Sequence, residues 1–272
     1  MSLVQQMIYQ DTKRQLLAGG LLSLISLVFF MGIVTFIPGS FIISIVYFAV
    51  FAITGIGLLK TGYDDLQKSK TTLDLEQDRT QEVLDRVPAR MYMGQKPIKS
   101  FQAGLFDMDG ESYGEIHEQM QWKHKLFTMF TALFSYDQLR PAGFTFTNQD
   151  GESLYRIEKK GGFKWRGYIQ HKDGAYVAYT KDTKNKTTGK RITRYIESDQ
   201  CRWSAEGDEF IGHFTVKDSK GEVWAVIKRG AIPTEAADRF ERMPGYLIEW
   251  KIRDDIPSSL LAFLFLLHSR ER

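Results

Sequence analysis

The densest group of residues able to do chemistry is a basic segment between Tyr155 and Tyr195. It contains twelve lysines and arginines against three acidic residues, a local net charge of +9. Their guanidinium and ammonium groups donate charge-assisted hydrogen bonds to phosphate oxygens, and each one held near an anionic membrane adds about 1 kcal/mol of attraction. Nine of these cations are predicted to bind anionic phospholipid headgroups: Lys159, Lys160, Lys164, Arg166, Lys184, Lys186, Lys190, Arg191 and Arg194.

Two other interpretations of this segment remain open. Solvated hairpin tips that only keep a domain soluble have the same composition. Nucleic acid is the weaker alternative, because the whole chain carries a formal net charge of only +3 and such a balance gives no global basic character.

Residues typical of catalysis or metal binding do not follow a recognisable spacing. The segment from Asp107 to Glu111 resembles the start of a calcium loop but lacks the later ligand positions and the terminal glutamate. The single Cys201 excludes an internal disulfide and a cysteine zinc site. No phosphate-binding glycine loop, nucleophile elbow or zinc-protease helix occurs. We therefore expect a protein that is not an enzyme and holds no cofactor or metal.

Two long uncharged segments near the N-terminus predict the element that positions the basic segment at a membrane. Leu16 to Ile37 and Phe41 to Leu59 are each long enough to cross about 30 Å of hydrocarbon as a helix. The residues between them, Pro38-Gly39-Ser40, are typical of a turn. A cleavable signal peptide is the weaker alternative, because a second span follows the first directly. Residues 1–62 are therefore expected to form a two-helix anchor.

The flanking charges predict the orientation of this anchor. Lys13 and Arg14 precede the first span, and Lys60 follows the second. Both ends satisfy the positive-inside rule on the same side of the membrane. We expect a two-pass protein of the cell membrane, with the N-terminus and everything after Leu59 in the cytoplasm.

Residues 63–89 form a charged connector with few apolar positions. The pattern favours a solvated helix that begins near Thr71 or Thr72 and ends before Pro88. Its apolar residues do not sustain the heptads of a coiled coil, so a homodimer is kept only as an alternative.

Beyond Ala89 the hydrophobic period changes to two, which is typical of strands. Glycine turns precede short alternating segments at Gly110, Gly151, Gly174 and Gly221, and more loosely at Gly189. Expected strands are 113–116, 119–125, 126–134, 144–147, 152–157, 163–169, 176–179, 192–196, 202–205, 214–217, 223–226 and 246–252. About a dozen antiparallel strands must close on themselves or pack face to face, because long open edges promote aggregation.

The C-terminal segment from Ser258 to Leu267 favours closure. Eight consecutive apolar residues follow its two serines. A helix apolar on every side must be enclosed, and at about 15 Å it is half the length needed to cross a bilayer. A sandwich has no room for such a helix, whereas a barrel of about twelve strands does. We therefore predict that residues 90–272 form a closed antiparallel β-barrel around this helix.

This arrangement resembles the tubby-like superfamily, which includes the plant LURP-one-related proteins and the phospholipid scramblases. The resemblance covers about Ile98 to Arg272, and the segments that carry it are Phe144–Ile157, Phe214–Arg229 and Ser258–Leu267. It implies a non-catalytic activity, the binding of phosphoinositides or of membrane phospholipid. The N-terminal hairpin departs from the family pattern, and none of the family's ligand residues matches a position here one to one.

The sequence thus predicts a membrane-anchored module whose cytoplasmic barrel binds anionic phospholipid headgroups. The alternatives are a scaffold or regulator that binds another membrane protein, and a lipid-handling protein of the scramblase kind. Neither span carries an ionisable residue to line a lipid pathway, which makes the lipid-handling alternative the weaker one.

Overall fold

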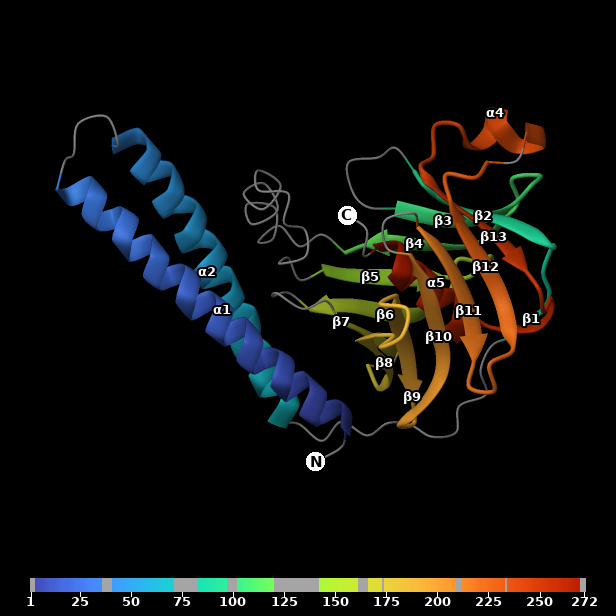
Figure 1. Ribbon diagram of the computed structural model, residues 1–272, viewed down its shortest axis with the longest axis horizontal. Coiled ribbons are helices and arrows are strands. Elements are labelled where there is room, and N and C mark those ends of the chain that lie inside the picture. Colours follow the sequence, from blue (N-terminus) through green and yellow to red (C-terminus); the bar gives the residue numbers. More distant parts are fainter. Residues whose placement is uncertain are drawn as a thin grey trace.

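The computed structural model describes residues 3–35, 41–70, 83–96, 102–119, 142–160, 166–172, 174–208, 212–232 and 234–269. These residues form a long helical hairpin, a closed antiparallel barrel and a helix inside the barrel (Figure 1). The expected fold class is confirmed.

The hairpin consists of α1 (Leu3–Val34) and α2 (Phe41–Lys70). By length and composition each is able to cross a membrane. Glycine allows the two backbones to approach: a Cβ atom on Gly19 would lie 2.9 Å from the carbonyl oxygen of Gly55. Large apolar side chains such as Leu17 and Ile42 point outward and are mostly exposed, as expected for helices that face lipid.

The barrel contains twelve strands, and every neighbouring pair is antiparallel. The strands are β2 (Arg90–Gln95), β3 (Gln102–Asp107), β4 (Ser112–Glu118), β5 (Ala142–Thr147), β6 (Ser153–Lys160), β7 (Arg166–His171), β8 (Tyr176–Lys184), β9 (Arg191–Glu197), β10 (Gln200–Asp208), β11 (His213–Asp218), β12 (Val223–Arg229) and β13 (Gly245–Trp250). The pairing of β13 with β2 closes the ring. Alternate residues face inward, so apolar positions spaced by two build the core.

Helix α5 (Ser258–Ser269) fills the barrel, and each residue from Leu260 to Leu267 is at most 7% exposed. Its side chains pack on the strands around it, as where Phe263 contacts Tyr195 and Phe265 contacts Phe146. Gly167 of β7 makes room for the helix, because a Cβ atom there would overlap Leu266. The C-terminal segment is therefore the core of the barrel, as predicted.

The prediction of a helix up to Pro88 is wrong for its last residues. Val83–Arg86 form β1, which pairs with β14 (Asp254–Pro257) in a separate two-stranded sheet. The physical reason is non-local: β14 lies directly before α5, and its backbone groups find partners in β1. Helix α2 itself continues through the first part of the connector to Lys70, and residues 71–82 lie outside the described part of the chain.

Strands β2 and β3 were not predicted. The expected strand 126–134 and all but the first residue of the expected strand 119–125 lie outside the described residues, as does the start of the expected strand 163–169. A short 3₁₀-helix, η2 (Thr234–Ala236), and α4 (Ala237–Phe240) cover the outer face of β2 and β3, where Phe240 stacks on Tyr92.

The two barrel ends differ in the elements that they present. We call the end where β6 stops and β7 starts the proximal end; it also holds the β8–β9 turn and the C-terminus of α5. The distal end holds the β3–β4, β5–β6, β7–β8, β9–β10 and β11–β12 turns. Three of the distal turns share one design, in which Asp107, Asn148 or Asp218 accepts a hydrogen bond from the backbone N–H of the glutamate four residues later.

Candidate functional site

The helical hairpin is docked on the outer face of β6, β7 and β8. Val4 and Ile8 of α1 are fully buried against Tyr168, Tyr176 and Tyr179 of the barrel. These three tyrosines face outward from the barrel, where without the hairpin their rings would meet water. The contact therefore buries apolar surface on both parts of the molecule.

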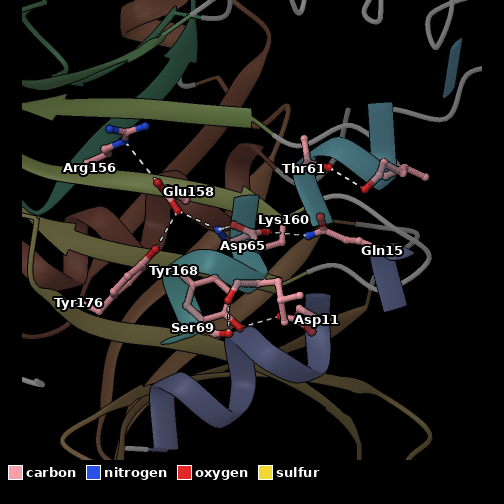
Figure 2. Close-up of polar contacts among 12 residues, drawn as sticks. Asp11, Gln15, Thr61, Asp65, Ser69, Arg156, Glu158, Lys160, Tyr168 and Tyr176 are labelled. Atoms are coloured by element: carbon pink, nitrogen blue, oxygen red, sulfur yellow. Dashed lines mark hydrogen bonds and ion pairs between the residues drawn. The ribbon is translucent and has the colours of Figure 1, made fainter. Parts of the chain in front are cut away.

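A buried charge cluster lies beside this apolar contact (Figure 2). Lys160 of β6 places its Nζ atom 2.6 Å from Oδ1 of Asp65 in α2 and 3.0 Å from Oε2 of Glu158. Tyr176 donates a hydrogen bond of 3.1 Å to the same oxygen of Glu158. Gln15 of α1 donates to the second oxygen of Asp65. Lys160 thus joins the barrel directly to α2, and Gln15 connects α1 to the same aspartate.

A second cluster joins α1 to β7. The guanidinium of Arg166 lies 3.2 Å from Oδ1 of Asp11, and the hydroxyl of Tyr168 donates a hydrogen bond of 2.7 Å to Oδ2. Arg14 approaches Asp11 from the solvent side at 3.3 Å. The side chains of Asp11 and Arg166 are 7% and 10% exposed, so this pair is held almost entirely out of water.

The electrostatics of the two clusters keep both barrel cations charged. Burial alone would lower the pKa of Lys160, but the negative charges of Glu158 and Asp65 outweigh it and raise this pKa above its ordinary value. Burial likewise opposes the charged form of Arg166, and Asp11 outweighs it, so the pKa of Arg166 is raised as well. We define the docking face as Glu158, Lys160, Arg166, Tyr168 and Tyr176 on the barrel together with Asp11 and Asp65 on the hairpin.

The order of contacts shows in which direction α1 passes the barrel. Val4 and Ile8 pack on the tyrosine cluster, and Asp11 contacts Arg166 at the start of β7. The chain of α1 therefore runs toward the proximal end, and its uncharged segment begins at Leu16, about 7.5 Å beyond Asp11 at ~1.5 Å per residue. In Figure 1 the hairpin extends past the barrel on the side where β5 and β7 begin.

The nine predicted lipid contacts do not converge on one site. Lys160 and Arg166 belong to the docking face. Lys159 is 5% exposed, and by strand alternation its side chain faces the barrel interior like that of Ile157. It pairs with Gly167 in the register of β6 and β7, close to the C-terminus of α5, where a cation is favoured. Lys164 lies outside the described residues.

The remaining five residues belong to the β8–β9 hairpin. Arg191 is paired with Asp182. Lys184, Lys186, Lys190 and Arg194 are exposed and make no ion pair within the described part of the chain. We call these four the β8–β9 basic group. Of the eight predicted residues that the structure describes, these four are exposed.

Charge is distributed unevenly between the two ends. The distal turns and their flanking residues carry many carboxylates: Asp107, Asp109, Glu111, Asp150, Glu152, Glu197, Asp199, Asp218 and Glu222. Lys172 and Lys220 are the described cations in the same turns. These five distal turns are thus acidic, although Arg86, Arg90, Lys251 and Arg253 lie at the same end, and the β8–β9 turn at the proximal end is basic.

Five of the seven residues of the docking face were not predicted as site residues from the sequence. They are Asp11, Asp65, Glu158, Tyr168 and Tyr176. One signal was present: Asp11 and Gln15 are spaced by four, as are Asp65 and Ser69, which places each pair on one helical face directly outside a span. Their partners in the barrel are far along the chain, and no local pattern reports them.

Comparisons with known proteins leave the family open. No family model matches the chain, and no curated protein matches it. A solved structure described as a protein from Arabidopsis thaliana aligns with a TM-score of 0.40 and 11% sequence identity, over 67% of this chain and 91% of that one. Within the described residues no group of three or more histidine, cysteine or acidic side chains is arranged to hold a metal ion.

Proposed function

We propose that this protein is a two-pass membrane protein whose cytoplasmic barrel is a non-enzymatic module for anionic phospholipid headgroups. The hairpin anchors the barrel at the inner face of the membrane. The β8–β9 basic group supplies the lipid contact, which narrows the nine predicted residues to Lys184, Lys186, Lys190 and Arg194.

The observation that carries the proposal is the direction of the hairpin relative to the barrel. Asp11 contacts the proximal end, and the first span begins about 7.5 Å farther along α1. The headgroup layer on each side of a bilayer is about 5–7 Å thick. The proximal end therefore faces the headgroups, and the β8–β9 turn opens toward them.

Two further features support the proposal. The exposed cations lie at the proximal end, toward which the hairpin leads into its first span, and an anionic leaflet there would attract them. The acid-rich turns lie at the distal end, away from that surface, so the barrel is not repelled. The resemblance to tubby-like proteins implies the same class of ligand.

The test is a fluorescent probe in the β8–β9 turn of the full-length protein. The variant Thr187→Cys, in a Cys201→Ser background, carries the probe in nanodiscs that contain a headgroup-labelled quencher lipid. We expect stronger quenching in discs with phosphatidylserine than in pure phosphatidylcholine discs at low salt. The triple variant Lys184→Glu, Lys186→Glu, Lys190→Glu should abolish the difference.

The matched control reverses two lysines at the distal end, Lys172→Glu and Lys220→Glu. These changes should leave the quenching unchanged, because both residues lie in turns that face away from the membrane. If the labelled protein without charge reversals were quenched equally in neutral and anionic discs, the lipid proposal would be wrong.

A second candidate function is a scaffold that binds another protein. The acidic distal turns favour it, because they would face the cytoplasm and present carboxylates to a basic partner surface. A photo-crosslinker at exposed Glu152 in intact cells tests this candidate. A stoichiometric product lost on raising the ionic strength is the expected result.

A further inference from the structure

The docking face combines two cations of the basic segment with carboxylates supplied by the hairpin. Lys160 is neutralised by Asp65 and Arg166 by Asp11, at 2.6 and 3.2 Å. A carboxylate and a phosphate offer the same kind of oxygen acceptor to a lysine or an arginine. The two aspartates therefore occupy positions on the barrel that phosphate oxygens would also fit.

The chemistry of the contact favours reversibility. Burying an ion pair costs desolvation energy that offsets much of its attraction. These pairs therefore define the orientation of the hairpin on the barrel more than they stabilise the contact. The apolar part of the contact is small: Val4 and Ile8 of α1 are fully buried against three tyrosines, with Met7 and Ile196 partly buried beside them. The hairpin and the barrel each keep their own cores when they separate, since α5 fills the barrel and the glycine contact joins the helices.

The place of the contact is the membrane surface. Asp11 lies five residues before the first uncharged segment, and Asp65 lies six residues after the second ends at Leu59. At about 7.5 and 9 Å from the ends of the spans, both aspartates therefore sit at the outer edge of the headgroup layer in the orientation proposed above. A barrel released from the hairpin would turn a face with Lys160, Arg166, three tyrosine rings and the carboxylate of Glu158 toward lipid phosphates.

We propose that the hairpin aspartates are an intramolecular competitor of anionic lipid for this face of the barrel. In a neutral membrane the hairpin occupies the face, and the barrel is held in one orientation. In an anionic membrane, headgroup phosphates replace Asp11 and Asp65 at Arg166 and Lys160, and the barrel separates from the helices. This inference rests on the proposed function and adds its regulation.

The test measures the separation directly in the full-length protein. Spin labels at exposed Gln6 of α1 and exposed Ser153 of β6, in a Cys201→Ser background, report the distance between hairpin and barrel in nanodiscs. We expect a single narrow distance distribution in phosphatidylcholine. In discs with phosphatidylserine we expect a broader distribution at longer distances. An unchanged narrow distribution would overturn the proposal.

Two variants separate competition from general destabilisation. Asp11→Asn with Asp65→Asn removes both competing charges at nearly constant shape and should broaden the distribution even in phosphatidylcholine. Asp64→Asn is the matched control, because Asp64 is exposed beside Asp65, and it should behave as the unaltered protein. Release by the control, or no release by the double variant, would contradict the assignment.

Two further measurements identify the source of the phosphate and isolate the proposed function. Inorganic phosphate added to phosphatidylcholine discs, compared with chloride at the same ionic strength, should leave the distribution narrow; release by it would contradict a lipid competitor. Turn quenching and hairpin release are separate signals. If phosphatidylserine increases the quenching of the turn but leaves the spin-label distances unchanged, the competition is wrong and the proposed function stands. If phosphatidylserine changes neither signal, the proposed function is wrong as well.

Discussion

Lys160 shows how much one side chain can depend on distant residues. It is buried, and its ammonium group balances one carboxylate from its own strand and one from α2. Removing such a cation leaves two buried negative charges without compensation, which costs far more than removing a solvated one. The side chain of its neighbour Lys159 lies on the opposite face of the same strand and points into the barrel.

Replacing Lys160 by methionine should therefore lower the free energy of unfolding by about 3–5 kcal/mol. Urea unfolding of the full-length protein in detergent, followed by the fluorescence of barrel tryptophans such as Trp203 and Trp250, measures the change. Lys184→Met is the control, since Lys184 is exposed and its loss should change stability by less than about 0.5 kcal/mol. Equal effects of the two variants would contradict the buried pairing.

Glu115 of β4 gives the barrel a dependence on pH. Burial tends to raise its pKa, but hydrogen bonds from Lys96 and Gln102 outweigh burial and hold this pKa below the ordinary value of 4.5. A carboxyl group with a lowered pKa stabilises the fold above its unfolded-state pKa, and the contribution is lost as the pH falls through the folded-state pKa. We expect Glu115→Gln to flatten the loss of stability as the pH falls below about 4.5 in urea titrations. Glu152→Gln, an exposed control, should leave the loss unchanged.

At the scale of elements, two contacts require close backbone or core packing. The crossing of α1 and α2 depends on glycine because the two backbones touch there. The barrel depends on α5 because the apolar inner faces of the strands pack against this helix.

Gly19 and Gly20 form a matched pair for testing the helix crossing. A Cβ atom on Gly19 would lie 2.9 Å from backbone atoms of Gly55 and Leu59, whereas one on Gly20 meets nothing within 4 Å. Gly19→Ala should push the helices apart and lower the thermal stability of the hairpin in detergent. Gly20→Ala should leave it unchanged or raise it slightly, because alanine favours the helix.

Leu264 tests the core helix, being 2% exposed inside the barrel. Leu264→Ala should destabilise the barrel by about 2–5 kcal/mol, and Leu264→Asp should unfold it, because an unpaired carboxylate cannot be buried there. Near-ultraviolet circular dichroism of the full-length protein follows the loss of packed aromatic residues. A cooperative, native-like spectrum for the aspartate variant would contradict the enclosed helix.

At the scale of the whole molecule, the hairpin and the barrel meet along one polar and aromatic face, and the proposed topology places that face at the inner membrane surface. A cysteine at Ser40, in the expected turn between the spans, should react with an impermeant maleimide in intact cells. A cysteine at Thr187 should react only after permeabilisation. Both variants carry Cys201→Ser, and labelling of Thr187→Cys in intact cells would reverse the orientation.

The sequence by itself determined the parts whose physics is local. Uninterrupted apolar runs predict membrane-length helices, alternation predicts strands, and the apolar run after Ser258 requires an enclosure that only a closed barrel provides. Tertiary structure decided which charges are solvated. Arg166 and Lys184 look alike in sequence, but one meets Asp11, 155 residues earlier in the chain, and the other meets water. Likewise Val83–Arg86 became a strand because Asp254–Pro257 lies beside it. Partners so far apart in the chain leave no periodic signal, and only the folded chain brings them together.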